Sequence, residues 1–503
     1  MSDEIELDIP EDPDAIPKTQ PEEVKTVTVE TPSVKNAIQS EEYRFLDKPQ
    51  EGTYSISMPT VPRDELAKQM SIAQKNTNID LKKPEMNVWK ETTEQSINSY
   101  TPGLLYQNRF RDPQSMFTQG ILKSDGNTQG ISRPKFKANS GELKGEAAIL
   151  QVSKSLGLGD TLTIPLPHSG IVVTVKPPQE RALVDFYNTI YREKIYLGRI
   201  TAGLTLTNMA AYINSRLFSF ILAHVHSLNY KDMSKEKLGD YISLHDFHIL
   251  AWGFAATQYP NGFDFERACT YDVEKCTHIE KGVINMLKLL WVDNTQLSEV
   301  QKQILLDYRP NQQDLEQHKK YMADHTRVRP KAHTLKNGMI VHLKVPTFNE
   351  HISDGMGWVS RINSDIERLI TDPETEQKEK TDLLTQYVNA TILRQFSHFI
   401  DFIELSADDG GSVITHRETI NSTLELLSSD DKIRPELTQV ILDYKSDTTI
   451  ALIGLPSYKC PSCGNPQNTN PVNERLVDVI PIDVMFTFFT LLTLRMSKIL
   501  ERE

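Results

Sequence analysis

The four cysteines are the residues of this sequence most suited to chemistry. Cys460 and Cys463 lie in a Cys-Pro-Ser-Cys segment followed by Gly464, and two thiolates at this spacing can face one metal ion. The glycine permits a left-handed backbone that turns nearby amides toward the sulfurs. This pattern is typical of a zinc knuckle, which supplies two of the four ligands that a structural Zn²⁺ needs.

The second pair of ligands is predicted in the middle of the chain. Cys269 and Cys276 are the other two cysteines, so the two pairs complete the four thiolates of one site. We predict a structural zinc bound by Cys269, Cys276, Cys460 and Cys463, which would staple the middle of the folded body to the strand before the last helix. The six residues between Cys269 and Cys276 exceed the usual spacing of about two to four. His278 is therefore the substitute ligand if one cysteine does not reach.

Two other functions are open to the same cysteines. A zinc-dependent enzyme would use Cys460, Cys463 and His278 with an open water position, and Glu266 or Glu274 would act as the general base. A zinc-ribbon nucleic-acid-binding protein would need a face rich in Lys and Arg near the knuckle, whereas the flanks of the knuckle offer one lysine.

Other catalytic motifs are missing from the sequence. His245 and His248 are spaced to share a helix face, but the Glu of an HExxH motif does not accompany them. Neither a Gly-x-Ser-x-Gly elbow nor a kinase signature is present. We therefore predict that the protein is not an enzyme.

Helices with short β-hairpins are expected to position these residues. Strands are predicted at 162–166 and 171–176, joined by a turn at 167–170, and Asn337-Gly338 predicts a second hairpin before a strand at 340–343. A further β-rich segment covers 447–455. Apolar residues at three- and four-residue spacing predict helices over 142–155, 178–196, 206–228, 235–257, 294–322, 350–371, 374–404, 416–428, 433–445 and from Pro481 to about 501. Thr415 and Glu418 have the spacing of a capping box for the helix at 416–428.

Composition divides the chain into four parts. Residues 1–42 hold twelve acidic residues and three lysines, which predicts a disordered acidic arm that can dock on a basic partner. Residues 43–140 carry aromatic residues without helical or strand periodicity, which indicates an extended partner-binding segment. The folded body is predicted as a helical part at 141–335 with the first hairpin and the first Cys pair. A second helical half at 336–503 holds the knuckle and an apolar terminal helix.

The overall charge and hydropathy exclude several classes of protein. A net charge of −13 and a pI near 5.6 predict no bulk attraction to nucleic acid or to anionic lipid. The apolar run at 482–494 is shorter than the roughly 20 residues that cross a bilayer, so no membrane span is expected. The predicted fold class is mainly α with short β-hairpins (α+β), with a disordered or extended N-terminal arm and one zinc-stapled body.

Three features in one order resemble a known family. They are the hairpin with Ile-Pro-Leu-Pro-x-Ser-Gly from Ile164 and Val-Thr-Val-Lys-Pro-Pro from Val173, the segment from Tyr259 to the Cys269/Cys276 pair, and the knuckle with an aromatic helix behind it. Over about residues 160–503 the sequence is similar to the baseplate hub and hub-assembly proteins of T4-type contractile-tailed bacteriophages.

This resemblance implies a non-enzymatic structural or assembly component of a phage tail baseplate. Its partners would be other tail and baseplate proteins. It would be assembled in the host bacterial cytoplasm and located in the virion. The acidic arm and the aromatic-dotted segment before residue 140 depart from the common pattern of the family.

Overall fold

The structure is a computed structural model of the full chain. It describes residues 46–47, 55–56, 113–116, 161–200, 210–259, 262–268, 276–307, 312–325, 329–369, 377–405, 411–456, 460–464, 479–482 and 484–500, and all of them belong to one unit, Glu41–Glu503. The acidic arm at 1–42, most of the segment at 43–140 and the predicted helix at 142–155 lie outside the described residues.

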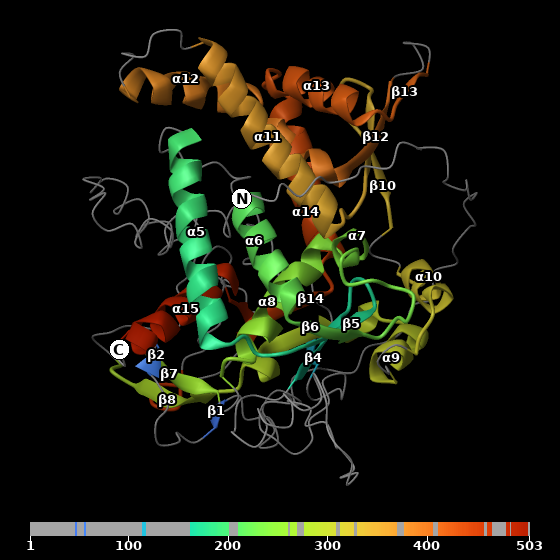
Figure 1. Ribbon diagram of the computed structural model, residues 1–503. Coiled ribbons are helices and arrows are strands. Elements are labelled where there is room, and N and C mark those ends of the chain that lie inside the picture. Colours follow the sequence, from blue (N-terminus) through green and yellow to red (C-terminus); the bar gives the residue numbers. More distant parts are fainter. Residues whose placement is uncertain are drawn as a thin grey trace. The chain divides into compact units, whose positions relative to one another are not determined.

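Helices and antiparallel strands make up this unit, as the α+β prediction requires (Figure 1). The described α-helices are α5 (Glu180–Ile200), α6 (Ala210–Ala223), α7 (Leu238–Tyr241), α8 (Leu244–Ala256), α9 (Glu299–Leu306), α10 (Leu315–Ala323), α11 (Phe348–Leu369), α12 (Gln377–Ala390), α13 (Arg417–Ser428), α14 (Ile433–Thr448) and α15 (Val484–Leu500). The described 3₁₀-helices are η3 (Met286–Leu289), η4 (Asn294–Gln296) and η5 (Ile392–Phe399).

The described strands form small sheets. One sheet has the order β4 (Leu162–Leu166), β5 (Ile171–Val175), β6 (Val225–Leu228), and a second has the order β10 (Lys331–Thr334), β11 (Ile340–Leu343), β12 (Ile400–Glu404), β13 (Val413–Ile414). A third has the order β15 (Val479–Pro481), β14 (Ala451–Pro456), β9 (Leu290–Asp293), β3 (Pro113–Ser115). The fourth has the order β1 (Leu46–Asp47), β8 (Ile279–Ile284), β7 (Phe263–Ala268), β2 (Ser55–Ile56), in which β2 pairs parallel with β7.

Both predicted hairpins are confirmed. Strand β4 pairs with β5 from Leu162↔Val175 to Leu166↔Ile171, and β10 pairs with β11 around the turn at Gly338, whose φ is +83°. The turn of the first hairpin ends at Gly170, where φ is +66°. Both turns contain a residue in the left-handed backbone conformation, which glycine adopts at a lower cost than other residues.

Helix α8 lies at the centre of the apolar core. All thirteen of its residues are buried, and it contacts β4, β14 and α15. The predicted terminal helix is confirmed as α15, whose residues Val484, Phe488 and Leu492 belong to the same core cluster as α8. Among the described residues, no helix has both the length and the apolar content needed to span a bilayer.

Four predicted helices are wrong in part because strands or new helix starts interrupt them. The end of the helix predicted at 206–228 is strand β6, which pairs with β5, and the end of the helix predicted at 374–404 is strand β12, which pairs with β11. The helix predicted at 235–257 is divided into α7 and α8 by Ser243, whose side chain accepts a bond from the His245 amide. The helix predicted at 294–322 is divided into α9 and α10, and each of them begins with its own capping box.

The predicted capping box at Thr415 and Glu418 is also wrong. The N-cap of α13 is His416, and its side chain makes no capping hydrogen bond. The helix therefore begins without the side-chain acceptor that the sequence spacing suggested.

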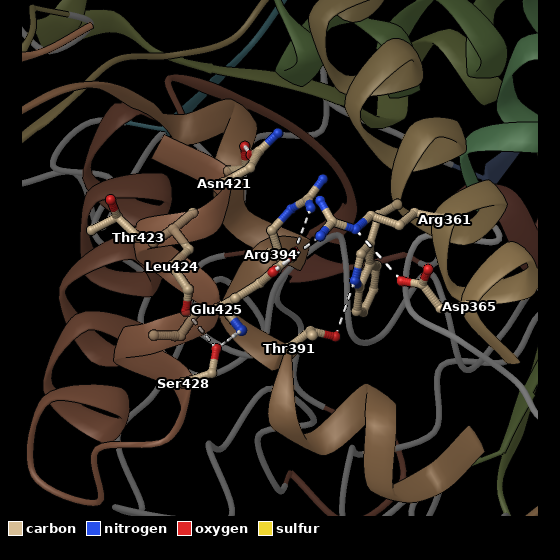
Figure 2. Close-up of polar contacts among 12 residues, drawn as sticks. Arg361, Asp365, Thr391, Arg394, Asn421, Thr423, Leu424, Glu425 and Ser428 are labelled. Carbon is tan, nitrogen blue, oxygen red and sulfur yellow. Dashed lines mark hydrogen bonds and ion pairs between the residues drawn. The ribbon is translucent and has the colours of Figure 1, made fainter. Parts of the chain in front are cut away.

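Polar contacts hold η5 between α11 and α13 (Figure 2). Glu425 on α13 accepts from Arg394 at 2.9 Å and contacts Arg361 of α11 at 3.5 Å. The Ser428 hydroxyl accepts from the Leu393 amide at 3.1 Å and donates to the Leu424 carbonyl at 2.7 Å. Arg394 is buried, with 4% of its surface exposed, and its carboxylate partner Glu425 is half-buried, so the ion pair lies at the edge of the core.

The turn at Gly170 yields a stability prediction. A Cβ at Gly170 would overlap the ring of Tyr321 and would stand on a left-handed backbone, so Gly170→Ala should lower the free energy of unfolding by on the order of 3 kcal/mol. Gly357→Ala is the matched control, because Gly357 is exposed on α11 with no atom near the added methyl group, and it should stabilise by about 0.5–1 kcal/mol. Urea unfolding measures both changes. If Gly170→Ala and Gly357→Ala changed the free energy of unfolding equally, Gly170 would not be crowded by Tyr321.

Candidate metal centre

Cys276 stands beside the hairpin formed by β7 and β8. The pairing of these strands ends at Ala268↔Ile279, so Cys276 precedes the first residue of β8 by three positions. Its side chain is buried, with 6% of its surface exposed. The thiol of Cys276 therefore stands on a short segment that leads directly into strand β8 and its hydrogen bonds with β7.

Cys460 and Cys463 lie in a tight turn after β14. The Gly464 amide donates to the Cys460 carbonyl at 2.8 Å, and Gly464 has a φ of +72°. The left-handed glycine that the knuckle pattern predicted is confirmed. Cys460 is 1% exposed, whereas Cys463 on the outer side of the turn is partly exposed. The turn therefore brings the two thiols close together, with Cys463 nearer to solvent than Cys460.

The structure brings three of the predicted ligands together. The sulfur atoms of Cys276, Cys460 and Cys463 all lie within 4.8 Å of one another, and the Sγ atoms of Cys276 and Cys460 are 3.8 Å apart. A disulfide bond would require about 2.05 Å. Two thiolates on a tetrahedral Zn²⁺ with Zn–S bonds of about 2.3 Å lie about 3.8 Å apart. The spacing therefore fits two ligands of one metal ion.

The fourth ligand stays a prediction. Cys269 follows the last residue of β7 in the sequence, but it lies outside the described residues. His278 is not part of the three-cysteine group, and its Nε2 atom is buried without a hydrogen-bond partner among the residues that the structure describes. The side chain of Glu266 and the whole of Glu274, the proposed general bases of the enzyme alternative, also lie outside the described parts of the chain.

A second polar cluster was missed by the sequence analysis. The buried carboxylate of Asp246 on α8 accepts from the backbone amides of His168 and Ser169 at 3.1 and 2.8 Å, from the His168 Nδ1–H at 2.8 Å, and from the Ser169 hydroxyl. All three residues are fully buried. The turn residues and the aspartate are far apart in the sequence, so only the tertiary fold reveals that they meet.

These three residue types also occur in hydrolase triads, but their bonding differs here. The Ser169 hydroxyl bonds to Asp246 rather than to the histidine, and the Nε2 atom of His168 accepts from the Ile450 amide at 2.9 Å. A nucleophilic serine needs the histidine nitrogen as its base. The cluster therefore joins the hairpin turn to α8 and to the start of β14, and it does not activate Ser169.

Replacing the aspartate tests this role. Asp246→Asn would place an amide NH₂ against donors that need an acceptor, so the free energy of unfolding should fall by about 3 kcal/mol. Asp232→Asn, at an exposed position, should change it by less than about 0.5 kcal/mol. Urea unfolding monitored by circular dichroism provides the comparison. If Asp246→Asn matched the control, Asp246 would not be the link between the turn and α8.

Two segments that are distant in the sequence thus place three cysteine thiols together, and this group could hold a metal ion. Comparisons of the chain with protein-family models, with curated proteins and with solved structures find no match.

Proposed function

We propose that the three clustered cysteines bind a structural zinc ion and that Cys269 completes the site. The observation that carries this proposal is the 3.8 Å separation of the Cys276 and Cys460 sulfurs, which stand 184 residues apart in the sequence. Thiolate ligands favour zinc among the divalent ions that prefer tetrahedral sites. A four-thiolate site leaves no open position for substrate or water, so its role would be to stabilise the fold.

The metal would fasten two segments of the fold that are distant in the sequence. Cys276 belongs to the β7–β8 hairpin, while Cys460 and Cys463 extend from β14, which pairs with β9. Two of the thiols are buried, and bringing three thiolates together without a cation would leave their charges uncompensated. The bound ion would supply that compensation and link the hairpin to the sheet.

We further propose that the protein is a non-enzymatic component of a contractile-tail baseplate, acting as a hub or hub-assembly protein. This proposal rests on the sequence resemblance over about residues 160–503 and on a site suited to stapling rather than to catalysis. Contacts with other tail proteins would carry the function, with the acidic segment at 1–42 as a further docking element.

Metal analysis tests the zinc staple. Purified wild-type protein should contain about one zinc per chain, and the Cys460→Ser/Cys463→Ser double variant should lose it, because two ligands of the four are removed. The variant should also lose on the order of 3 kcal/mol of stability. Inductively coupled plasma mass spectrometry and thermal denaturation measure the two effects.

Ser462→Ala is the matched control, because Ser462 is exposed in the same turn and offers no thiol. It should keep the full zinc content and the thermal midpoint of the wild type. A freshly prepared, reduced wild-type protein without zinc would refute the staple. A separate Cys269→Ser variant identifies the fourth ligand: retention of tightly bound zinc would remove Cys269 from the site and favour the open, enzyme-like alternative.

The baseplate role is tested independently of the metal. Mass spectrometry of purified particles and of tail-assembly intermediates, from the phage that encodes this chain, should detect the protein at a fixed ratio to known tail proteins. An assembly factor would be present in the intermediates only. Absence from both would refute the baseplate role while leaving the metal site unaffected.

A further inference from the structure

A group of basic side chains lies buried where α8 meets α11, η5 and α14. We call it the buried histidine cluster. Each member is at most 7% exposed, and the members come from both predicted halves of the body. They are His245 and His248 on α8, His351 on α11, His398 in η5 and Lys445 on α14. Five basic groups buried close together are uncommon, because burial penalises their charged forms.

Hydrogen bonds connect two members to each other and to a carboxylate. Asp354 accepts from the His398 amide at 3.1 Å and lies 3.3 Å from its Nδ1 atom, so that nitrogen carries a hydrogen. The Nε2 atom of His398 lies 3.2 Å from Nδ1 of His351, so one of these two nitrogens donates to the other. The carboxylate of Asp354 thus anchors a hydrogen-bonded chain of two imidazoles.

His245 is fixed in the same way on the opposite side of the cluster. The Thr448 hydroxyl donates to the Tyr444 carbonyl at 2.9 Å, so its oxygen is available to accept from Nε2 of His245 at 3.0 Å. The Nδ1 atom of neutral His245 then carries no hydrogen. The bond joins α8 directly to the end of α14 and depends on the neutral ring having this tautomer.

The titratable groups that face the cluster are mainly basic, and they include His168, whose ring centroid lies 5.1 Å from that of His245. Burial is the main cause that lowers the pKa of His248 to about 3 and places the pKa values of His245 and His351 well below the usual value. Lys445 lowers all three further, and burial brings its own pKa to about 7. Among the carboxylates packed nearby, Asp354 is bonded to His398, and Asp246 is bonded to the His168 turn.

We propose that the buried histidine cluster is an acid-triggered latch, which holds α8 against α11, η5 and α14 at neutral pH and releases this contact on acidification. Helix η5 is also bonded to α13, through Arg394 and Glu425 (Figure 2). We therefore expect η5 to stay with α13 when the contact with α8 opens. This inference does not depend on the zinc site.

The direction of the effect follows from the lowered histidine pKa values. An exposed histidine titrates near about 6.5, so in the open state each ring gains a proton below that pH while the closed state resists protonation. The histidine contribution to the stability of the closed state is therefore complete above about pH 6.5. Below that pH the equilibrium constant for closing falls about tenfold per pH unit for each such histidine. At pH 5.0 the loss is about 30-fold for His248, whose closed-state pKa is about 3.

Hydrogen–deuterium exchange on the full-length protein tests the latch. Between pH 7.5 and 5.0, after correction for intrinsic exchange rates, protection of α8, α11 and α14 should fall at least 30-fold. The β10–β11 hairpin serves as the internal reference and should change less. His248→Leu should recover about 30-fold of the loss at pH 5.0, and His351→Leu should recover a part of it. His416→Gln, at an exposed position, should keep the wild-type loss.

A second variant keeps the test decisive if the leucine variants do not fold. Lys445 is charged in the open state but largely neutral in the closed state above about pH 7, so raising the pH from 7 to 9 should favour the wild-type closed state by about tenfold per unit. Lys445→Met, which removes the charge and keeps an unbranched side chain of similar length, should abolish that rise in stability, as measured by urea unfolding. Equal pH profiles for the wild type and all cluster variants would overturn the latch, as would a loss of protection spread evenly over the described elements.

Discussion

The carboxylate of Asp246 is the polar interaction on which the rest of the described fold depends. It is fully buried on the most buried helix, and a buried charge is tolerated only when its lone pairs are occupied. The first hairpin turn supplies those donors, and His168 extends the link to the Ile450 amide, just before β14. One aspartate therefore connects the first sheet, the central helix and the strand that leads to Cys460.

The candidate metal centre makes use of this connection. The cysteine turn follows β14, which is positioned by its pairing with β9 on one side and β15 on the other. Because the Cys276 and Cys460 sulfurs are 3.8 Å apart, a metal ion would find them at nearly the spacing of two zinc ligands. The proposed zinc would then reinforce a geometry that the apolar core and Asp246 have established.

Local signals in the sequence predict much of this arrangement, and long-range contacts account for what they do not predict. The hairpin glycines, the terminal helix and the left-handed Gly464 follow from short motifs, and the meeting of Cys276 with Cys460 and Cys463 follows from the small number of cysteines. Strands β6 and β12 were predicted as helix ends because their apolar residues fit either period, and only pairing with β5 and β11 decides between them. Asp246 and the buried histidine cluster could not be found from spacing, since their partners lie on other elements.

The position of α15 has a consequence for synthesis on the ribosome. Its apolar face packs on α5 and α8, and the Leu491 carbonyl accepts from the Tyr259 hydroxyl at 3.0 Å. Translation proceeds from the N-terminus, so α8 emerges more than two hundred residues before the helix that covers it. During that interval the apolar surface that α15 later covers is exposed on the growing polypeptide. A chaperone or rapid elongation would then protect the chain from aggregation.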